Sequence, residues 1–299
     1  MNPEKEKSKI WLILFFLLFI IVIIAAGVLF KQYMDHQAAS AQFDSLQASV
    51  NDVADDDAED MEEVYIKEGE QEAEVKDAEE EIPESVTEDG DKEIDIVEEY
   101  GIEIPEKDLD WNALHEQNED IYAWIYVPDT TVDYPILQHP TDNSYYLNYN
   151  MDGTKGYPGC IYTEDFNSKD FSDIHTVIYG HNLKDKTMFS SLHNFEDREL
   201  LSEDHYIFIY TQDYVFVYRI FAAYEFSAIH LLDNFDYTNE YVYADYLKQI
   251  YRTADWGANV REDIEVTTDD KIVTLSTCTA DHDSNRRFLV TGVLVNPKE

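Results

Sequence analysis

Two short stretches bring together residue types that can support nucleophilic catalysis. The stretch KIVTLSTCTADHDSNRRFLV places Cys278 at the end of one apolar run and the pair Arg286-Arg287 at the start of the next. A cysteine attacks as its thiolate, and a neighbouring guanidinium favours that form. The stretch TVIYGHN ends another apolar run with His181, and His is the side chain most often used as a general acid or base. The residue types therefore suggest a Cys-His-Arg site.

Each of these residues also has an ordinary structural explanation. A lone cysteine in a β-rich domain is more often an inert, buried thiol than a nucleophile. A single histidine among nine is usually a surface or core residue. Partners in a catalytic site are adjacent in space and not in sequence, so spacing alone leaves both explanations open.

The cysteine run alternates in polarity, which indicates how its side chains are presented if it forms a strand. Neighbouring residues then point to opposite faces, and Cys278 shares the more polar face with Ser276. By the same rule only one of Arg286 and Arg287 can face Cys278, and the other must reach solvent or a carboxylate. Position alone does not choose between the two arginines. The core face is expected to carry Val273, Leu275 and Thr277, and the other face Ile272, Thr274, Ser276 and Cys278.

The elements that must position these residues lie after about Asp108, where the chain becomes rich in Tyr, Phe, Ile and Val. Many short β-branched and aromatic runs bounded by turn residues predict an antiparallel barrel or sandwich. One helix is predicted from Glu240 to Ala254, where apolar residues recur at helical spacing and should pack on the barrel. A short helix is predicted after Asp110, which is a suitable N-cap. The predicted strands are IYAWIYV, PDTTVDYPILQ, GCIYTEDF, HTVIYG, HYIFIYT, DYVFVYRIFAAYEF and KIVTLSTC.

The N-terminus carries a long apolar run. Residues 10–30 contain no charge, and 21 residues suffice to cross a hydrocarbon core of roughly 30 Å as a helix. The apolar region of a secretory signal is usually shorter, so we expect an uncleaved transmembrane helix. Three lysines precede the run and an acidic segment follows it. The positive-inside rule therefore predicts that residues 1–9 are cytoplasmic and that the rest of the chain is extracellular.

Acidic residues dominate the next segment and the chain as a whole. The formal net charge is −43, and residues 51–100 hold 24 Asp and Glu against three Lys. Such a charge argues against nucleic-acid binding, which needs Lys and Arg for the phosphates. With few aromatics and no hydrophobic period, residues 31–107 are expected to form a disordered acidic spacer. The acids lack the pattern of a calcium-binding loop, so no metal site is expected.

Taken together, the motifs resemble those of sortases, and more specifically of class B sortases. TLSTC is followed by an arginine that opens the next strand, and YGHN lies about a hundred residues upstream. The resemblance covers residues 108–299 and includes WIYVPDTTVDYPILQ, NSYYLNYNMDGTKGYPGCIYTED and TVIYGHNLKDKTMFSSLHNF. The helix before the cysteine strand is similar to the insertion that separates class B from class A. The resemblance implies a mostly β fold with flanking helices: a closed barrel of about eight strands, an N-terminal helix and a helix inserted before the cysteine strand.

The resemblance also implies roles for individual residues. Cys278 is similar to the family nucleophile, His181 to its catalytic histidine and Arg287 to its arginine, with Arg286 as the alternative. Ser276 matches the family position two residues before the nucleophile. Tyr179, two residues before His181, is a further candidate for lining the substrate groove. Cys160 is expected to be a packed thiol, because a disulfide with Cys278 would abolish the nucleophile.

The activity implied is that of a membrane-anchored cysteine transpeptidase of Gram-positive bacteria that uses no cofactor. Its substrates would be surface proteins with a C-terminal sorting signal such as NPxTN or a PxTG variant, cut at the threonine through a thioester. An amine of the lipid-linked peptidoglycan precursor would resolve that thioester. Two alternatives remain open: a pilin polymerase of the same fold that uses a pilin lysine, and a non-enzymatic surface module that binds a partner.

Overall fold

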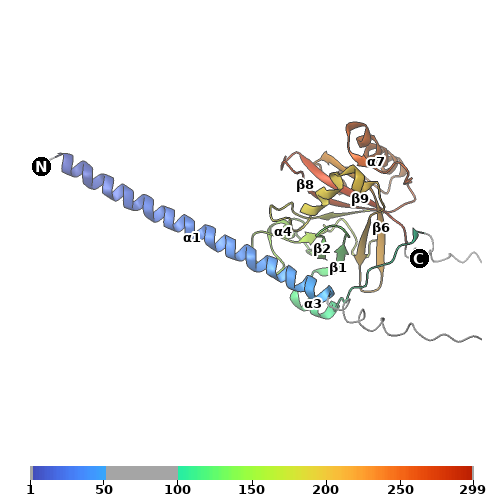
Figure 1. Cartoon of the computed structure of the whole chain (residues 1–299), viewed down its shortest axis with the longest axis horizontal. Coiled ribbons are helices and arrows are strands. Elements are labelled where there is room, and N and C mark those ends of the chain that lie inside the picture. The colour runs from blue at the N-terminus through green and yellow to red at the C-terminus, as the bar shows by residue number, and fades with distance from the viewer. Residues whose placement is uncertain (1–2, 52–99, 298–299) are drawn as a thin grey trace, which may run out of the picture.

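Eight strands close into a barrel in the computed structural model. The structure describes residues 3–51 and 100–297, and Figure 1 shows the barrel with helix α1 extending from it. The strand order is β5-β1-β2-β3-β4-β8-β9-β6, pairing of β5 with β6 closes the barrel, and β7 extends it beyond β6. The expected closed barrel of about eight strands is confirmed. The strands are β1 (Ile121–Tyr126), β2 (Asp133–Leu137), β3 (Ile161–Tyr162), β4 (His175–Tyr179), β5 (Tyr206–Tyr210), β6 (Val215–Ser227), β7 (Asn259–Val260), β8 (Ile272–Cys278) and β9 (Arg286–Leu294).

Apolar side chains form one cluster within the barrel and a second cluster against its outer face. Strand β8 contributes to both, because Val273 and Leu275 belong to the first cluster and Ile272 to the second. Helix α7 (Glu240–Arg252) covers the second cluster with Tyr243, Tyr246, Leu247 and Ile250, as its helical spacing predicts. The polar face of β8 is therefore also covered along most of its length, and only its end at Ser276 and Cys278 borders a cleft.

Short helices connect the strands. Asp110 caps the first of them, α3, by accepting hydrogen bonds from the backbone N–H groups of Asn112 and Ala113, as expected for an N-cap. These helices are α3 (Trp111–Gln117), α4 (Tyr145–Asn148), α5 (Arg198–Leu201), α6 (Leu231–Asn234) and the 3₁₀ segments η2 (Ser190–Glu196) and η3 (Thr253–Trp256).

Helix α1 (Pro3–Asn51) is a long rod that projects away from the barrel (Figure 1). Its apolar residues from Trp11 to Phe30 are largely exposed. Among the described residues this is the one helix long and apolar enough to cross a membrane. An exposed apolar surface of this length is what a hydrocarbon environment would cover.

The last turns of α1 pack against the barrel. Ala39, Phe43, Leu46 and Val50 recur at helical spacing and are buried, with the Phe43 ring edge-on to Tyr134 of β2 at 5.6 Å between centroids. This corrects the expectation that the disordered spacer begins at residue 31. The structure continues the helix to Asn51, because this part of the acidic region still carries an apolar stripe.

The chain before the acidic segment lies beside the chain after it, at Val50–Asn51 and Lys107–Asp108. The Asp108 N–H donates to the Val50 carbonyl at 3.2 Å, and the Lys107 ammonium contacts both Asn51 and Asp133 at 2.8 Å. Ile102 is buried, so the folded part also begins before residue 108. Residues 52–99, the centre of the predicted spacer, lie outside the described residues.

Candidate active site

Cys278 and Arg287 are paired across strands β8 and β9. Directly opposed residues of an antiparallel pair project to the same face, so Arg287 shares the face of Cys278 and Arg286 does not. Arg286 instead forms ion pairs with Glu225, Asp281 and Asp283. This arrangement answers the question that the sequence left open, because the outward arginine reaches carboxylates.

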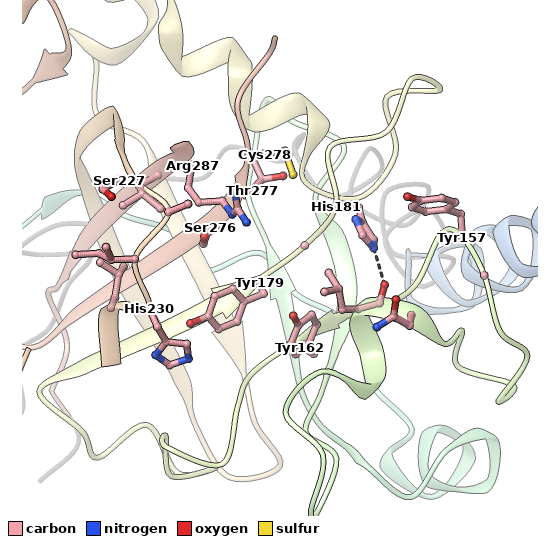
Figure 2. Close-up of a pocket in the computed structure, with 18 of the residues that line it drawn as sticks. Tyr157, Tyr162, Tyr179, His181, Ser227, His230, Ser276, Thr277, Cys278 and Arg287 are labelled. Atoms are coloured by element: carbon pink, nitrogen blue, oxygen red, sulfur yellow. Dashed lines mark hydrogen bonds between the residues drawn. The ribbon is translucent and has the colours of Figure 1, made fainter. Parts of the chain in front are cut away.

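The Arg287 side chain is held at the edge of the cleft by backbone oxygens. Its Nη1 donates to the carbonyls of Arg286 at 2.8 Å and Ser284 at 3.3 Å. In Figure 2 the sulfur of Cys278 lies between the Arg287 side chain and the His181 ring. All three residues line the same cleft, which has a volume of about 600 Å³.

His181 follows strand β4 and reaches the cleft because β4 runs parallel to β8, with Tyr179 in register with Ser276. Its Nε2 lies 2.7 Å from the Leu147 carbonyl in α4 (Figure 2, dashed). A carbonyl can only accept, so the neutral ring carries its proton on Nε2 and leaves Nδ1 as a proton acceptor. Burial lowers the pKa of His181 from its ordinary value, and the Leu147 hydrogen bond opposes this shift in part.

Two glycines allow the His181 ring to sit where it does. Gly159 has a φ of +69°, and a Cβ there would lie 3.1 Å from His181 Cδ2 and 2.9 Å from the Tyr146 carbonyl oxygen. A Cβ on Gly180 would meet Ile161 at 2.6 Å and Phe189 at 2.7 Å. The position of the histidine therefore depends on close backbone approach from both sides.

The remaining predicted site residues line the same cleft. Ser276 is buried two residues before Cys278, and Tyr179 faces the cleft from β4 (Figure 2). Burial and the neighbouring carboxylate of Glu164 raise the pKa of Tyr179 above its usual range, so its hydroxyl is neutral and can donate. His230 pairs with the same carboxylate at 2.5 Å and completes this wall of the cleft.

Two residues that the sequence did not single out hold the backbone of the cysteine. Asn182 Nδ2 donates to the carbonyls of Cys278 at 3.2 Å and Thr279 at 3.4 Å. His193 Nε2 lies 3.0 Å from the same Cys278 carbonyl, and its Nδ1 faces Glu196 at 2.5 Å. Asn182 follows the motif histidine directly and could have been noticed, whereas nothing in the sequence around His193 marks it.

The second cysteine lies apart from this chemistry. Cys160 is buried and free, and its sulfur faces the Tyr149 carbonyl at 3.7 Å. Burial raises the pKa of the Cys160 thiol well above its ordinary value, which suppresses the reactive thiolate. Cys160 is thus a packed thiol, as expected. Within residues 3–51 and 100–297, no group of three or more His, Cys, Asp or Glu side chains is placed to hold a metal ion.

Comparison with known proteins gives a consistent result. The family model described as "Sortase domain" matches residues 125–295. Sortase B of Listeria monocytogenes is 34% identical over 184 residues, which is 61% of this chain and 72% of that protein. Sortase B of Staphylococcus aureus is 28% identical over 187 residues, or 62% and 74% of the two chains.

Solved structures give the same result in three dimensions. A structure described as "Staphylococcus aureus sortase B-substrate complex" superposes with a TM-score of 0.54 at 26% identity and covers 62% of this chain and 85% of its own. The family match over residues 125–295 spans most of the barrel and its cleft, and it leaves out α1 and the acidic segment.

Proposed function

This chain belongs to the sortase family, class B, and we propose that it cuts C-terminal sorting signals of the NPxTN or PxTG type at the threonine and joins the new carboxyl end to a cell-wall amine. The observation that supports this most is the cleft shared by Cys278, Arg287 and His181. The three residues supply a nucleophile, a cationic donor and a proton carrier, which is what acyl transfer requires.

The first half of the reaction forms a thioester. His181 Nδ1 takes the thiol proton, and the Cys278 thiolate attacks the threonine carbonyl. Arg287, held beside the sulfur by strand pairing, donates to the developing oxyanion. The C–N bond then breaks, and the leaving amine takes its proton from the His181 imidazolium.

The second half transfers the acyl group. An incoming primary amine attacks the thioester carbonyl and gives a proton to His181 as the new C–N bond forms. The C–S bond breaks, and Cys278 leaves as the thiolate that began the cycle. We assign the acceptor amine to the lipid-linked peptidoglycan precursor, because α1 carries an apolar run that would keep the barrel at a membrane surface. In this proposal residues 1–9 are cytoplasmic and the barrel is extracellular.

Turnover of a fluorogenic sorting peptide tests this proposal. Cys278→Ala should abolish cleavage and His181→Ala should nearly abolish it, while Cys160→Ser should keep most of the activity. Mass spectrometry should detect an acyl adduct on the wild-type protein that Cys278→Ala lacks. Full cleavage by Cys278→Ala would exclude the mechanism, and cleavage profiles over a peptide library would identify the sorting signal.

A further inference from the structure

A second cleft reaches Cys278 and His181 from the side of helix α1. It has a volume of about 870 Å³ and shares both residues with the first cleft. One wall is formed by Gln32, Asp35 and His36 of α1. In Figure 2 the blue ribbon of α1 lies on the Tyr157 side of His181, away from Ser227 and His230. The remaining walls come from the loops at residues 155–157, 182–185 and 282.

The helix wall is fixed to the loop that follows the catalytic histidine. His36 Nε2 lies 2.9 Å from Asp185 Oδ2, which ties α1 directly to that loop. The buried residues Ala39 and Phe43, one and two turns further along, anchor the same part of the helix on the barrel. The ion pair and the buried side chains therefore hold the α1 wall of the second cleft against the barrel.

The second cleft is also close to the end of the apolar run. Asp35 is five residues after Phe30, which corresponds to about 7 Å along a helix axis. A molecule that is held in the membrane could enter this cleft without leaving the lipid surface. The two clefts share the loop at residues 155–157 as well as Cys278 and His181. From there the first cleft extends toward Ser227 and His230, and the second extends toward α1.

From these relations we infer that the second cleft binds the acceptor substrate: a peptide with a free primary amine that hangs from a lipid carrier, with α1 forming one wall of its site. This rests on the proposed function and adds the entry route of the second substrate. While the acyl group occupies the first cleft, the amine approaches from the second, attacks the thioester carbonyl and gives its proton to His181. The C–N bond forms as the C–S bond breaks.

The charged side chains that line the second cleft suit a peptide better than the hydrocarbon tail of a lipid. Lys155 and Lys184 provide cations, and the carboxylates of Asp35 and Asp185 are paired with Lys31 and His36. A peptide that carries both ammonium and carboxylate groups can form ion pairs with these side chains in place of the existing pairs. The hydrocarbon tail of a lipid would remove water from these charges without pairing them, which is costly.

Blocking the α1 wall tests the inference in the full chain reconstituted in lipid nanodiscs. Gln32→Trp with Asp35→Trp fills the second cleft from the helix side. The matched control is Met34→Trp with Gln37→Trp, which keeps the spacing and shifts it by two residues, about 200° around the helix. Met34 and Gln37 are exposed and line neither cleft.

Three reactions are compared for each protein: hydrolysis of a sorting peptide, transfer to hydroxylamine, and transfer to a peptide amine anchored on a phospholipid in the same nanodisc. The anchored peptides carry triglycine or a diaminopimelate side-chain amine. In the blocked variant, transfer to the anchored amine should fall at least tenfold, while hydrolysis and hydroxylamine transfer stay within about twofold. The control variant should match the wild type in all three.

Equal transfer to the anchored amine by the blocked and control variants would overturn the inference. It is also overturned if the wild type cleaves the peptide but uses neither anchored amine faster than hydroxylamine. Absence of peptide cleavage in the wild type would instead contradict the proposed function itself, so the two failures are distinguishable.

Discussion

Cys278 and Arg287 are direct cross-strand partners at the end of the β8–β9 ladder. Their relative position is set by backbone pairing and not by the loop between them, residues 279–285. Arg286 and its three carboxylate partners tie that loop down from the opposite face. The position of Arg287 relative to the Cys278 sulfur is therefore fixed by the strands of the barrel.

The two arginines should differ sharply when substituted. Loss of one oxyanion donor typically costs roughly 10²–10³ in turnover, so Arg287→Ala should lose at least that much. Arg287→Lys should lose a similar amount, because it keeps the charge and removes the planar fork. Turnover of the fluorogenic peptide measures both.

Arg286→Ala is the control, since its side chain contacts surface carboxylates and not the cleft. We expect it to lose less than about tenfold, in line with the small effects of most surface substitutions. The reverse ranking would assign the catalytic role to Arg286.

Gly159→Ala should impair catalysis by displacing the His181 ring. The added Cβ would press on His181 Cδ2 and on the Tyr146 carbonyl, and displacements near 1 Å can cost about 10²-fold in rate. Gly153→Ala is the matched control, because Gly153 also has a positive φ (+78°) but its Cβ would meet only Tyr145, at 4.0 Å. Comparable losses of turnover in the two variants would mean that backbone strain, and not His181, is responsible.

His175 should make the barrel less stable in acid. It is fully buried beside Tyr237 and Tyr246, and burial lowers its pKa to about 3. Between pH 6.5 and 3 the unfolded chain binds a proton there that the folded chain does not, so stability falls as pH falls through this window. The loss amounts to about 2 kcal/mol between pH 7 and pH 5.

Urea unfolding at these two pH values checks the expectation. Wild type should lose about 2 kcal/mol more between them than His175→Gln, since glutamine does not titrate. Other titrating groups contribute equally to both proteins and cancel in the difference. Identical pH dependence in the two would show that His175 is protonated in the folded state.

The acidic segment should be dispensable for the fold of the barrel. The Asp108 N–H is hydrogen-bonded to the Val50 carbonyl, and the eight residues 100–107 span at most about 28 Å. The gap between Asn51 and Tyr100 is therefore short enough for a ten-residue Gly-Ser linker to replace residues 52–99. We expect that replacement to keep peptide cleavage within about twofold and the melting temperature within a few degrees. A large loss of either would assign residues 52–99 a structural role.

The end of α1, in contrast, should contribute to stability. Phe43 is buried against Tyr134, so Phe43→Ala should destabilise the protein by about 3 kcal/mol. Asp44→Ala, a change at the exposed neighbouring position, should have little effect. Equal urea midpoints for the two variants would mean that α1 does not pack on the barrel in solution.

Strand alternation predicted a barrel or a sandwich, and helical spacing predicted the helix before the cysteine strand. The resemblance of the motifs to those of sortases predicted the closed barrel and the residues that share the cleft. Alternation also showed that one arginine must face away, and the resemblance favoured Arg287 as the inward one. The pairing register with Cys278 places Arg287 on the face of the cysteine. That register depends on contacts between strands, which a single sequence does not display.

The contacts that hold the site residues in place could not be predicted from the sequence for a related reason. The Leu147 carbonyl that fixes the His181 tautomer is a backbone atom 34 residues away, and backbone atoms leave no mark in composition. The packing of α1 was missed because an acidic average over residues 31–107 concealed the apolar stripe of Phe43, Leu46 and Val50.

The continuity of α1 has a consequence for orientation. From the apolar run to Val50 the chain is one helix. The residues between Phe30 and Ala39 therefore fix the distance of the clefts from the apolar run and their rotation about the helix axis. One residue inserted there would raise the clefts by 1.5 Å and rotate them by 100° about the helix axis. Insertion of a whole heptad would nearly restore the azimuth and add about 10 Å of height. In the proposed orientation, the number of residues between Phe30 and Ala39 therefore sets the height of the active site above the membrane and its rotation relative to the apolar run.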